Sequence, residues 1–309
     1  MNKQFSDQQL KTLCSIAVRA AQQAGEWIEK FDRQNLKTVF KNAGSSEASQ
    51  LVTEVDIASE SIIRNSLQEF SESLDIAFVG EESSQDAADS IERFEKPYFW
   101  CVDPLDGTLP FSQGRSGFSV SISLLEQSGK PVIGVVYDPD QRVLWHAIDQ
   151  QGCYRNQTAF NSTLQSLDRR NSNTLMVYAD ASFKTHENYD LAYEALERCA
   201  HSLGLEGANF IYGNGAVINA CNVIDSSFAC YLKLPKLEEG GGSIWDYAAT
   251  ACIAKESRAW ASNSYGQALD LNRRDSTFMN HQGVLFASSA QVAQCLLGAL
   301  SSSIGRSKH

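Results

Sequence analysis

The acidic residues Asp103 and Asp106 are three positions apart in the segment D-P-L-D-G-T, directly after an apolar run. A strand over that run would bring both carboxylates to the edge of a sheet. Mg²⁺ prefers oxygen ligands in an octahedral arrangement, and the backbone carbonyl of Leu105 can complete such a set. Gly107 would permit close backbone approach, and Thr108 would open the next segment with free N–H groups that can hold a phosphate. The segment therefore predicts a site for a hard cation and a phosphate group.

A tight turn is the alternative for this segment, because D-P-x-D-G is also an excellent turn sequence. Other acidic positions favour the metal site. Glu81 and Glu82 follow another apolar run, where adjacent like charges are unfavourable unless water or a cation compensates them. Asp246 stands beside Trp245 at a predicted helix start, where it could bind a metal or interact with the helix dipole. Asp56 stands on another predicted helix, with N-capping or solvation as its alternative role.

Each acidic motif alone is compatible with a turn or a solvated loop, and only their combination favours a metal site. We expect a magnesium site formed by five acids: Glu81, Glu82, Asp103, Asp106 and Asp246. Competing catalytic motifs do not fit the sequence. Glycines 240–242 lack the G-K-[ST] ending of a phosphate loop, and no G-x-S-x-G segment is present. The D-x-x-D spacing also differs from the D-x-D of phosphatases that form an aspartyl-phosphate.

Charge and composition exclude several other functions. The formal net charge of −11 disfavours binding to nucleic acid or to an anionic membrane through bulk charge. The eight cysteines form no C-x-x-C pair and the five histidines do not cluster, so buried free thiols are expected and zinc chemistry is disfavoured. The beginning of the sequence has no signal-peptide core, and no run approaches the roughly 18 apolar residues of a membrane span. A cytoplasmic protein is therefore expected.

The acidic segments need helices and strands to position them. Apolar residues near the N-terminus recur at the helical period, and Ser6 with Gln9 predicts a capping box at the start of that helix. A second helix is predicted over 53–70, with Thr53 as its N-cap. Residues 42–50, between the two helices, are small and polar and predict a mobile loop.

The middle of the sequence is β-rich, and its last third alternates between helices and strands. Strands are predicted at 75–79 and 98–102, each ending at acidic residues. Alternating apolar residues over 118–147 predict an antiparallel meander, and a polar stretch follows at 155–173. The later predictions are a strand at 175–179, a helix at 187–203, a loop at 234–242, a helix from Trp245, a strand at 283–287 and a helix at 290–300.

Four segments in this order resemble the inositol monophosphatase superfamily: V-T-E-V-D (52–56), G-E-E-S (80–83), D-P-L-D-G-T (103–108) and W-D-Y-A-A (245–249). Segments 134–139 and 278–285 also look like that superfamily, so the resemblance spans nearly the whole chain. It implies an α/β fold, a layered αβαβα sandwich of the sugar-phosphatase type. An N-terminal α+β half, residues 1–165, would carry most metal ligands. A C-terminal α/β half, residues 166–309, would contribute Asp246 and a substrate loop.

The resemblance also implies how the metal ligands divide. Glu81 and Asp103 would hold one Mg²⁺ together with the Leu105 carbonyl, while Asp103, Asp106 and Asp246 would hold a second. Glu82 would support the site or contact a further metal, giving two or three Mg²⁺ ions. Such ions can lower the pKa of an attacking water and neutralise charge on the leaving oxygen.

Three residues are implied in catalysis by the same resemblance: Asp56, Glu81 and Thr108. Asp56 would accept a hydrogen bond from Thr108, whose hydroxyl would help to orient and activate the attacking water. The backbone N–H groups of Gly107 and Thr108 would hold the phosphate, and Asp106 would contribute to substrate binding. The resemblance thus implies a magnesium-dependent phosphomonoesterase, whose products are inorganic phosphate and an alcohol, without a phosphoenzyme.

The resemblance leaves the substrate open between two groups. Segments around 103–108, 129–137 and 279–280 look like the 3'(2'),5'-bisphosphate nucleotidases, although that group usually follows D-G-T with Lys-Glu, whereas this sequence has Leu109-Pro110. Inositol monophosphatases often carry a glutamate seven residues before the late aspartate, and Glu239 stands at that spacing. A solvated loop acid is the alternative for Glu239. The nucleotidase is weighted slightly ahead of inositol-1-monophosphatase.

Members of the superfamily are often homodimers and are commonly inhibited by lithium, which are expectations here. The expected partner is a small phosphorylated metabolite, and neither nucleic acid nor a membrane. A hypothesis of another class is a non-catalytic regulatory or binding protein that retains the fold. A broken set of metal ligands would favour that hypothesis, and the sequence retains every acid.

Overall fold

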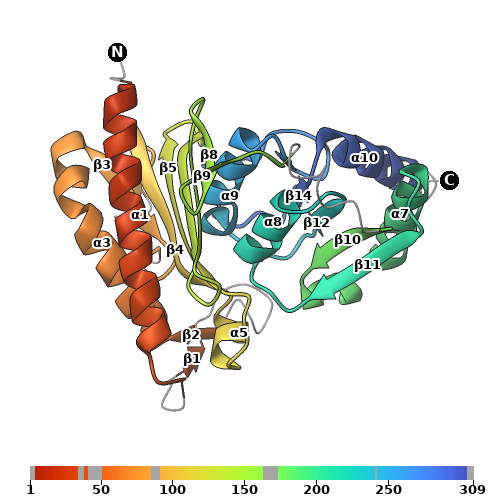
Figure 1. The fold of residues 1–309 in the computed structure, drawn as a ribbon, viewed down its shortest axis with the longest axis horizontal. Helices are drawn as coiled ribbons and strands as arrows, with labels where there is room; N and C mark the ends of the chain where they lie inside the picture. Colours follow the sequence, from red (N-terminus) through yellow and green to blue (C-terminus); the bar gives the residue numbers. More distant parts are fainter. Residues whose placement is uncertain are drawn as a thin grey trace.

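The computed structural model describes residues 4–33, 38–40, 51–84, 91–162, 173–240 and 242–304. Within these ranges the chain forms two large sheets, with helices on their outer faces and between them (Figure 1). Two predictions fall outside the described residues: the mobile loop at 42–50 and the boundary between the halves at 165/166. Among the described helices, none is both long and apolar enough to cross a membrane.

The larger sheet has the strand order β3-β4-β5-β6-β7-β8-β9. β3 is parallel to β4, and the pairs that follow are antiparallel, which confirms the meander predicted over 118–147. The last strand lies within the polar stretch at 155–173. The strands are β3 (Ile76–Gly80), β4 (Tyr98–Asp106), β5 (Ser119–Glu126), β6 (Pro131–Asp138), β7 (Val143–Ile148), β8 (Gly152–Arg155) and β9 (Thr158–Phe160).

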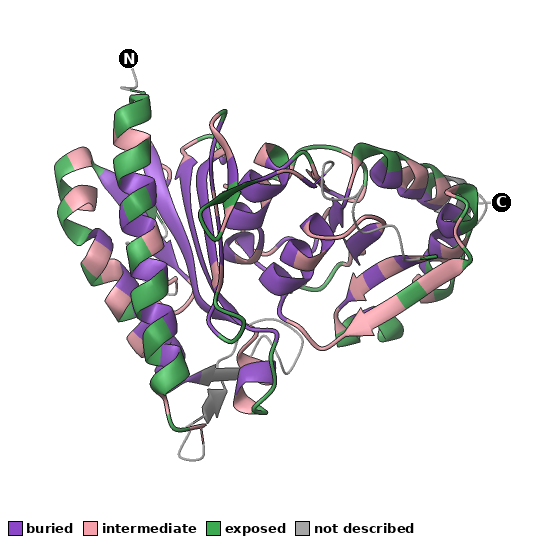
Figure 2. Cartoon of the chain, in the orientation of Figure 1, coloured by how far each residue is buried: buried purple, intermediate pink, exposed green. Residues whose placement is uncertain are grey.

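Two long helices, α1 (Asp7–Lys30) and α3 (Glu54–Leu74), cover the outer face of this sheet. α1 begins at the predicted capping box of Ser6 and Gln9. α3 begins after its predicted N-cap, Thr53, and is preceded by the short antiparallel pair β1 (Thr38–Phe40) and β2 (Leu51–Thr53). Each helix buries one apolar stripe against the sheet and exposes the opposite side (Figure 2), as its periodicity predicts.

The second sheet has five strands in the order β11-β10-β12-β14-β13. Its outer face is covered by α7 (Tyr189–Ser202) and α10 (Ala290–Ile304), and the 3₁₀ helix η2 (Ala181–Thr185) lies between β10 and α7 in the chain. The strands and helices predicted after residue 174 are all present, with ends shifted by a few residues. The strands are β10 (Thr174–Ala179), β11 (Gly207–Tyr212), β12 (Ala229–Lys233), β13 (Trp260–Ser262) and β14 (Val284–Ala287).

Two helices lie between the sheets: α8 (Ala216–Ile224) and α9 (Ile244–Glu256). Both are buried almost all round (Figure 2), because α8 packs on β10 and β12 while α9 packs on β5, β6 and β13. A helix buried on all sides has apolar residues around its whole circumference. β6 approaches α9 so closely that a Cβ on Gly134 would lie 2.3 Å from the Ala249 carbonyl oxygen. The five layers α/β/α/β/α confirm the predicted sandwich.

Candidate metal and phosphate site

The end of β4 positions the first two acids of the site. The register with β5 shifts between Asp103 and Asp106, which marks a β-bulge. Pro104 can occupy the bulge because it has no N–H to contribute to the ladder. The Leu105 N–H donates to Asp103 Oδ1 at 3.1 Å and orients that carboxylate. Bulges re-aim side chains, and this one lets two acids of a single strand reach the same place.

Asp246 reaches that place from the first turn of α9. Its Oδ2 accepts a hydrogen bond from the Ser243 N–H at the N-cap. Gly242 has φ 83°, and a Cβ there would lie 2.8 Å from Asp246 Oδ2, so a side chain would crowd the acid. Carboxylate oxygens of Asp103, Asp106 and Asp246 all lie within 4.8 Å of one another. Three of the five predicted acids therefore converge.

The converging acids are electrostatically unfavourable as they stand. Burial raises the pKa of Asp106 well above its usual range, and the neighbouring charge of Asp246 raises it further. Burial also raises the pKa of Asp246 to about 6, against the opposing effect of the Lys233 ammonium. A divalent cation at this place would supply the missing positive charge.

Glu81 and Glu82 lie on the turn that follows β3. The Glu81 N–H donates to the Val102 carbonyl at 3.0 Å and so holds the turn beside β4. The Glu81 charge contributes, after burial, to the raised pKa values of Asp106 and Asp246, which places its carboxylate in their electrostatic neighbourhood. Neither glutamate belongs to the group whose oxygens all lie within 4.8 Å. Their roles as metal ligands stay predictions.

The hydrogen bond predicted between Thr108 and Asp56 is present. The Thr108 hydroxyl donates to Asp56 Oδ1 at 2.9 Å and also lies 3.1 Å from the Leu105 carbonyl oxygen. Asp56 Oδ2 accepts from the N–H of Thr53, at 2.9 Å, and from its hydroxyl. Burial raises the pKa of Asp56 to about 6, although these hydrogen bonds favour its ionised form. The contact is confirmed, and the catalytic role stays a prediction.

Gly107 makes the turn that follows β4 possible. Its φ of 83° lies in the left-handed region, and a Cβ would lie 2.6 Å from the Gly117 carbonyl oxygen. It is the N-cap of the short helix α5 (Thr108–Ser112). The predicted close approach of backbone at this position is therefore confirmed, whereas the phosphate contacts of Gly107 and Thr108 stay predictions.

Asp106 also connects the larger sheet to helix α8, which the sequence did not predict. Its Oδ1 accepts from the Ala216 N–H at 2.9 Å and its Oδ2 from the Val217 N–H at 3.0 Å, so it caps the N-terminus of α8. Gly215 permits this approach, since a Cβ there would lie 2.2 Å from Asp106 Oδ2. Glycines at 213 and 215 before an apolar run are the signal for this helix start, but nothing in the sequence names its capping acid.

A buried lysine next to Asp246 is a second feature that the sequence did not predict. The Lys233 side chain is 14% exposed, and its Nζ lies 2.7 Å from Asp180 Oδ2 and 5.6 Å from the centre of the Tyr247 ring. Burial has the largest single effect and lowers the pKa of Lys233, but Asp180, Tyr247 and Asp246 together outweigh it and the pKa is raised. Tyr231 donates its hydroxyl to the same aspartate at 3.1 Å. In the sequence this lysine is a single charge in an apolar strand.

Glu239 lies on the exposed loop between β12 and α9. Its side chain is exposed, and its Oε1 lies 3.5 Å from the Ser276 hydroxyl. It is not among the three converging acids. The predicted substrate contact of Glu239 is untested and stays a prediction.

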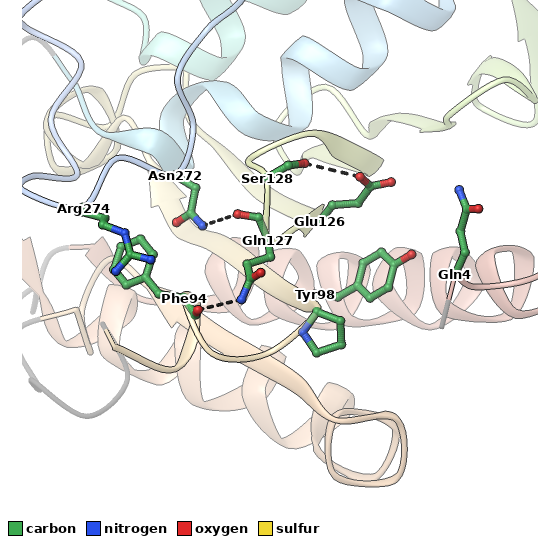
Figure 3. Close-up of a pocket in the computed structure, with 9 residues that line it drawn as sticks. Gln4, Phe94, Tyr98, Glu126, Gln127, Ser128, Asn272 and Arg274 are labelled. Carbon is green, nitrogen blue, oxygen red and sulfur yellow. Dashed lines mark hydrogen bonds between the residues drawn. The ribbon is translucent and has the colours of Figure 1, made fainter. Parts of the chain in front are cut away.

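Two cavities lie away from the acids. A cavity of about 450 Å³ lies beside β4, where Gln127 donates to the Phe94 carbonyl and Asn272 donates to the Gln127 carbonyl (Figure 3). Another, of about 620 Å³, lies between α1 and the hairpin of β7 and β8, and Tyr154 and His146 stack at its edge. Neither is lined by any of the five predicted acids.

All eight cysteines are free thiols, as predicted, and only Cys295 is partly exposed.

Comparison with known proteins defines the class to which this fold and site belong. Residues 9–304 match the inositol monophosphatase family, and the chain belongs to that family of phosphatases, which act on small phosphorylated substrates. It is 33% identical to inositol monophosphatase 3 of Solanum lycopersicum, over 84% of this chain and 88% of that protein. It is 31% identical to the 3'(2'),5'-bisphosphate nucleotidase CysQ of Salmonella typhimurium, over 74% and 82%. These two relatives carry different names, so the family is shown while the substrate is not.

A solved structure supports the fold. The inositol monophosphatase of Anabaena (Nostoc) sp. PCC 7120 superposes with a TM-score of 0.66 at 21% identity, covering 95% of this chain and 97% of that one. Proteins of this family generally use Mg²⁺. The converging groups fit that ion, because they offer carboxylate oxygens only, which suit a hard cation, and because the pKa values of Asp106 and Asp246 are raised by burial and by neighbouring negative charge.

Proposed function

We propose that the chain is a Mg²⁺-dependent phosphomonoesterase, with a 3'(2'),5'-bisphosphate nucleotidase as the preferred activity and inositol-1-monophosphatase as the alternative. The convergence of Asp103, Asp106 and Asp246 from two elements far apart in the sequence is the observation that carries the proposal. Three acids brought together without compensation, two of them buried, would destabilise the fold, so a metal-binding role accounts for their presence.

The metal ligands in this proposal are Glu81, the Leu105 carbonyl and the three converging acids, with Glu82 as support. When bound, Mg²⁺ would lower the pKa of the attacking water and neutralise negative charge on the phosphate. The Thr108 hydroxyl, held by Asp56, would orient that water. The N–H groups of Gly107 and Thr108 would bind phosphate oxygens, since they open α5. The ester P–O bond would break as the oxygen of water joins phosphorus, giving inorganic phosphate and an alcohol.

The first test is phosphate release with and without metal. Activity should require Mg²⁺, disappear with EDTA, and fall more than about hundredfold in Asp103→Asn and in Asp246→Asn, since losing even a partner that orients a ligand typically costs about 10–100-fold. Asp140→Asn, an exposed acid on the turn after β6, is the matched control and should keep normal activity. Full turnover in both ligand variants would rule out the mechanism.

The buried Lys233 ammonium supports the nucleotidase over the inositol phosphatase. A bisphosphate carries more negative charge than an inositol monophosphate, and Lys233 is a positive charge held in place by Asp180 close to Asp246. The acid expected to hold inositol, Glu239, is exposed and near Ser276. Both observations favour a second anionic group on the substrate over a sugar ring.

Substrate choice is tested by kcat/KM for adenosine 3',5'-bisphosphate and inositol 1-phosphate on one preparation. The bisphosphate should be preferred, and Lys233→Met should reduce that preference by about 10–160-fold, as expected for one charge-assisted contact of about 1.5–3 kcal/mol. Lys236→Met, in the loop that follows β12, is the control and should leave the ratio unchanged. A wide preference for inositol phosphate in the unmodified chain would reverse the proposed order.

The non-catalytic hypothesis depended on a broken set of ligands. The three converging acids are intact, so catalysis is favoured. A panel of small phosphomonoesters at saturating Mg²⁺ tests this choice. If none of them releases phosphate, the non-catalytic binding role would be favoured instead.

A further inference from the structure

One face of α3 contacts both segments that carry the acids of the site. Asp56, Ser59 and Glu60 lie on this face, because residues three and four apart in a helix are neighbours. The Ser59 hydroxyl donates to the Pro104 carbonyl at 2.8 Å, within the β4 bulge. Glu60 Oε2 accepts from the Glu82 N–H at 2.8 Å, on the turn after β3. The Asp56 contact has been described above, and the Glu60 contact has no role in the proposed reaction so far.

Glu60 is a buried acid with several donors. Its residue is 6% exposed. Burial raises the pKa of Glu60, while hydrogen bonds from Ser83 and the Glu82 N–H and the nearby Arg64 charge favour its ionised form. Arg64 itself donates to the Ser83 hydroxyl at 2.9 Å and stacks on the Phe78 ring at 4.1 Å. The turn after β3 is therefore held by two side chains of α3, the Glu60 carboxylate and the Arg64 guanidinium.

Gly80 shows that the backbone is shaped around this carboxylate. A Cβ on Gly80 would lie 2.2 Å from Glu60 Oε2 and 2.5 Å from its Cδ. Both values are far below any contact that real Cβ atoms make, so a side chain at position 80 would displace the carboxylate from the turn. The glycine directly before Glu81 thus leaves the space that the Glu60 carboxylate occupies.

We propose that Glu60 is a positioning residue of the metal site, which fixes the turn at residues 80–83 and thereby aims the Glu81 carboxylate at Asp106 and Asp246. Glu60 itself touches neither metal nor substrate. The inference rests on the proposed metal-binding role of Glu81. A residue that orients a ligand typically contributes about 10–100-fold to metal affinity, because the free turn would otherwise have to be ordered on binding.

The test measures Mn²⁺ binding to the full chain by electron paramagnetic resonance of the free ion, without substrate. Glu60→Ala should weaken binding about 10–100-fold. Glu60→Gln, which keeps an oxygen acceptor for the Glu82 N–H, should weaken it less. Gly80→Ala should weaken it although Glu60 is unchanged. Glu69→Ala, an exposed position of the same helix, is the control and should bind as the unmodified chain does.

The kinetic readout separates positioning from general damage. For Glu60→Gln, the Mg²⁺ concentration needed for half-maximal activity should rise severalfold while kcat at saturating Mg²⁺ stays within about threefold, because high metal concentration restores the loaded site. Mn²⁺ dissociation constants for Glu60→Ala and Gly80→Ala within twofold of the unmodified chain would overturn the inference. If Mn²⁺ binding depends on Glu60 but no phosphomonoester is hydrolysed, the inference stands and the proposed activity fails. An unmodified chain that binds no Mn²⁺ would overturn both.

Discussion

At the scale of single residues, hydrogen bonds decide what each acid can do. One Asp56 oxygen accepts hydrogen bonds from Thr53 and the other accepts one from Thr108. Both oxygens are therefore engaged, and the carboxylate is fixed in place. Both Asp106 oxygens accept hydrogen bonds from backbone N–H groups at the start of α8. Carboxylate oxygens have further lone pairs, so a capped Asp106 can still ligate a cation. The acids of the site are therefore held in position before any ligand arrives.

The Thr108 hydroxyl can be separated from its methyl group by substitution. Thr108→Val keeps the side-chain volume and removes the hydroxyl, so kcat should fall about 10²–10⁴-fold, the range typical of positioned proton-transfer groups. Thr108→Ser keeps the hydroxyl and should retain most of the activity. The measurement is phosphate release at saturating Mg²⁺, with Mn²⁺ binding measured alongside. Equal kcat values for the valine and serine variants would contradict a role for the hydroxyl.

At the scale of helices and strands, the sequence predicted what local pattern determines. The capping box at Ser6, the N-cap at Thr53 and the strand predicted at 98–102, which continues to Asp106 in the structure, follow from side-chain chemistry within a few residues. The helix α8 is apolar on almost every side, so no periodicity distinguished it from a strand. Asp106, which caps this helix, lies on β4 and is 110 positions away in the chain. A capping partner so distant in sequence is revealed only by the tertiary structure.

The candidate site divides in the same way. The motifs predicted which acids could meet, because each follows an apolar run that ends at a sheet edge or opens a helix. Lys233 and Glu60 were not singled out, since a single charge within an apolar strand and a glutamate on an amphipathic helix are both ordinary. Only the packing of the elements shows that Glu60 is buried beside the turn after β3 and that Lys233 is largely shielded from solvent near Asp246.

The tight contact between β6 and α9 can be tested by comparing two glycine-to-alanine substitutions, one at this contact and one in α10. Gly134→Ala should destabilise the fold by about 1–3 kcal/mol, the typical cost of overpacking, because the new methyl would lie against the Ala249 carbonyl. Gly298→Ala in α10 meets nothing within 4 Å and should instead stabilise the fold by up to about 1 kcal/mol. Urea unfolding measures both. Equal effects would mean that the layers are less tightly packed than described.

At the scale of the whole molecule, the buried acids link stability to pH and metal. Asp56, Asp138 and Asp246 have pKa values raised to about 6, whereas unfolded aspartate titrates near 3.9. Between these values the unfolded chain binds fewer protons than the folded one, so folding stability falls as pH rises. Above about pH 6 the full cost of the ionised acids is present.

This linkage predicts the melting temperature under two conditions. In EDTA, Tm should fall between about pH 4.5 and 7, and Mg²⁺ should raise Tm more at pH 7 than at pH 5, because the metal binds ionised carboxylates. Asp246→Asn should make the fall with pH in EDTA shallower. Differential scanning calorimetry measures these shifts. A Tm in EDTA that rises steadily over this range would contradict the assignment of raised pKa values.

The bond from Asp106 to α8 spans 110 positions of the chain. Ribosomes add about 5–20 residues per second, so the strand bearing Asp106 must wait several seconds during synthesis for its partner helix, and longer for α9. Until both arrive, the inner face of the larger sheet has no cover, and the nascent protein exposes an apolar surface of the kind that chaperones bind. Translation speed and chaperone supply should therefore affect the yield of this protein.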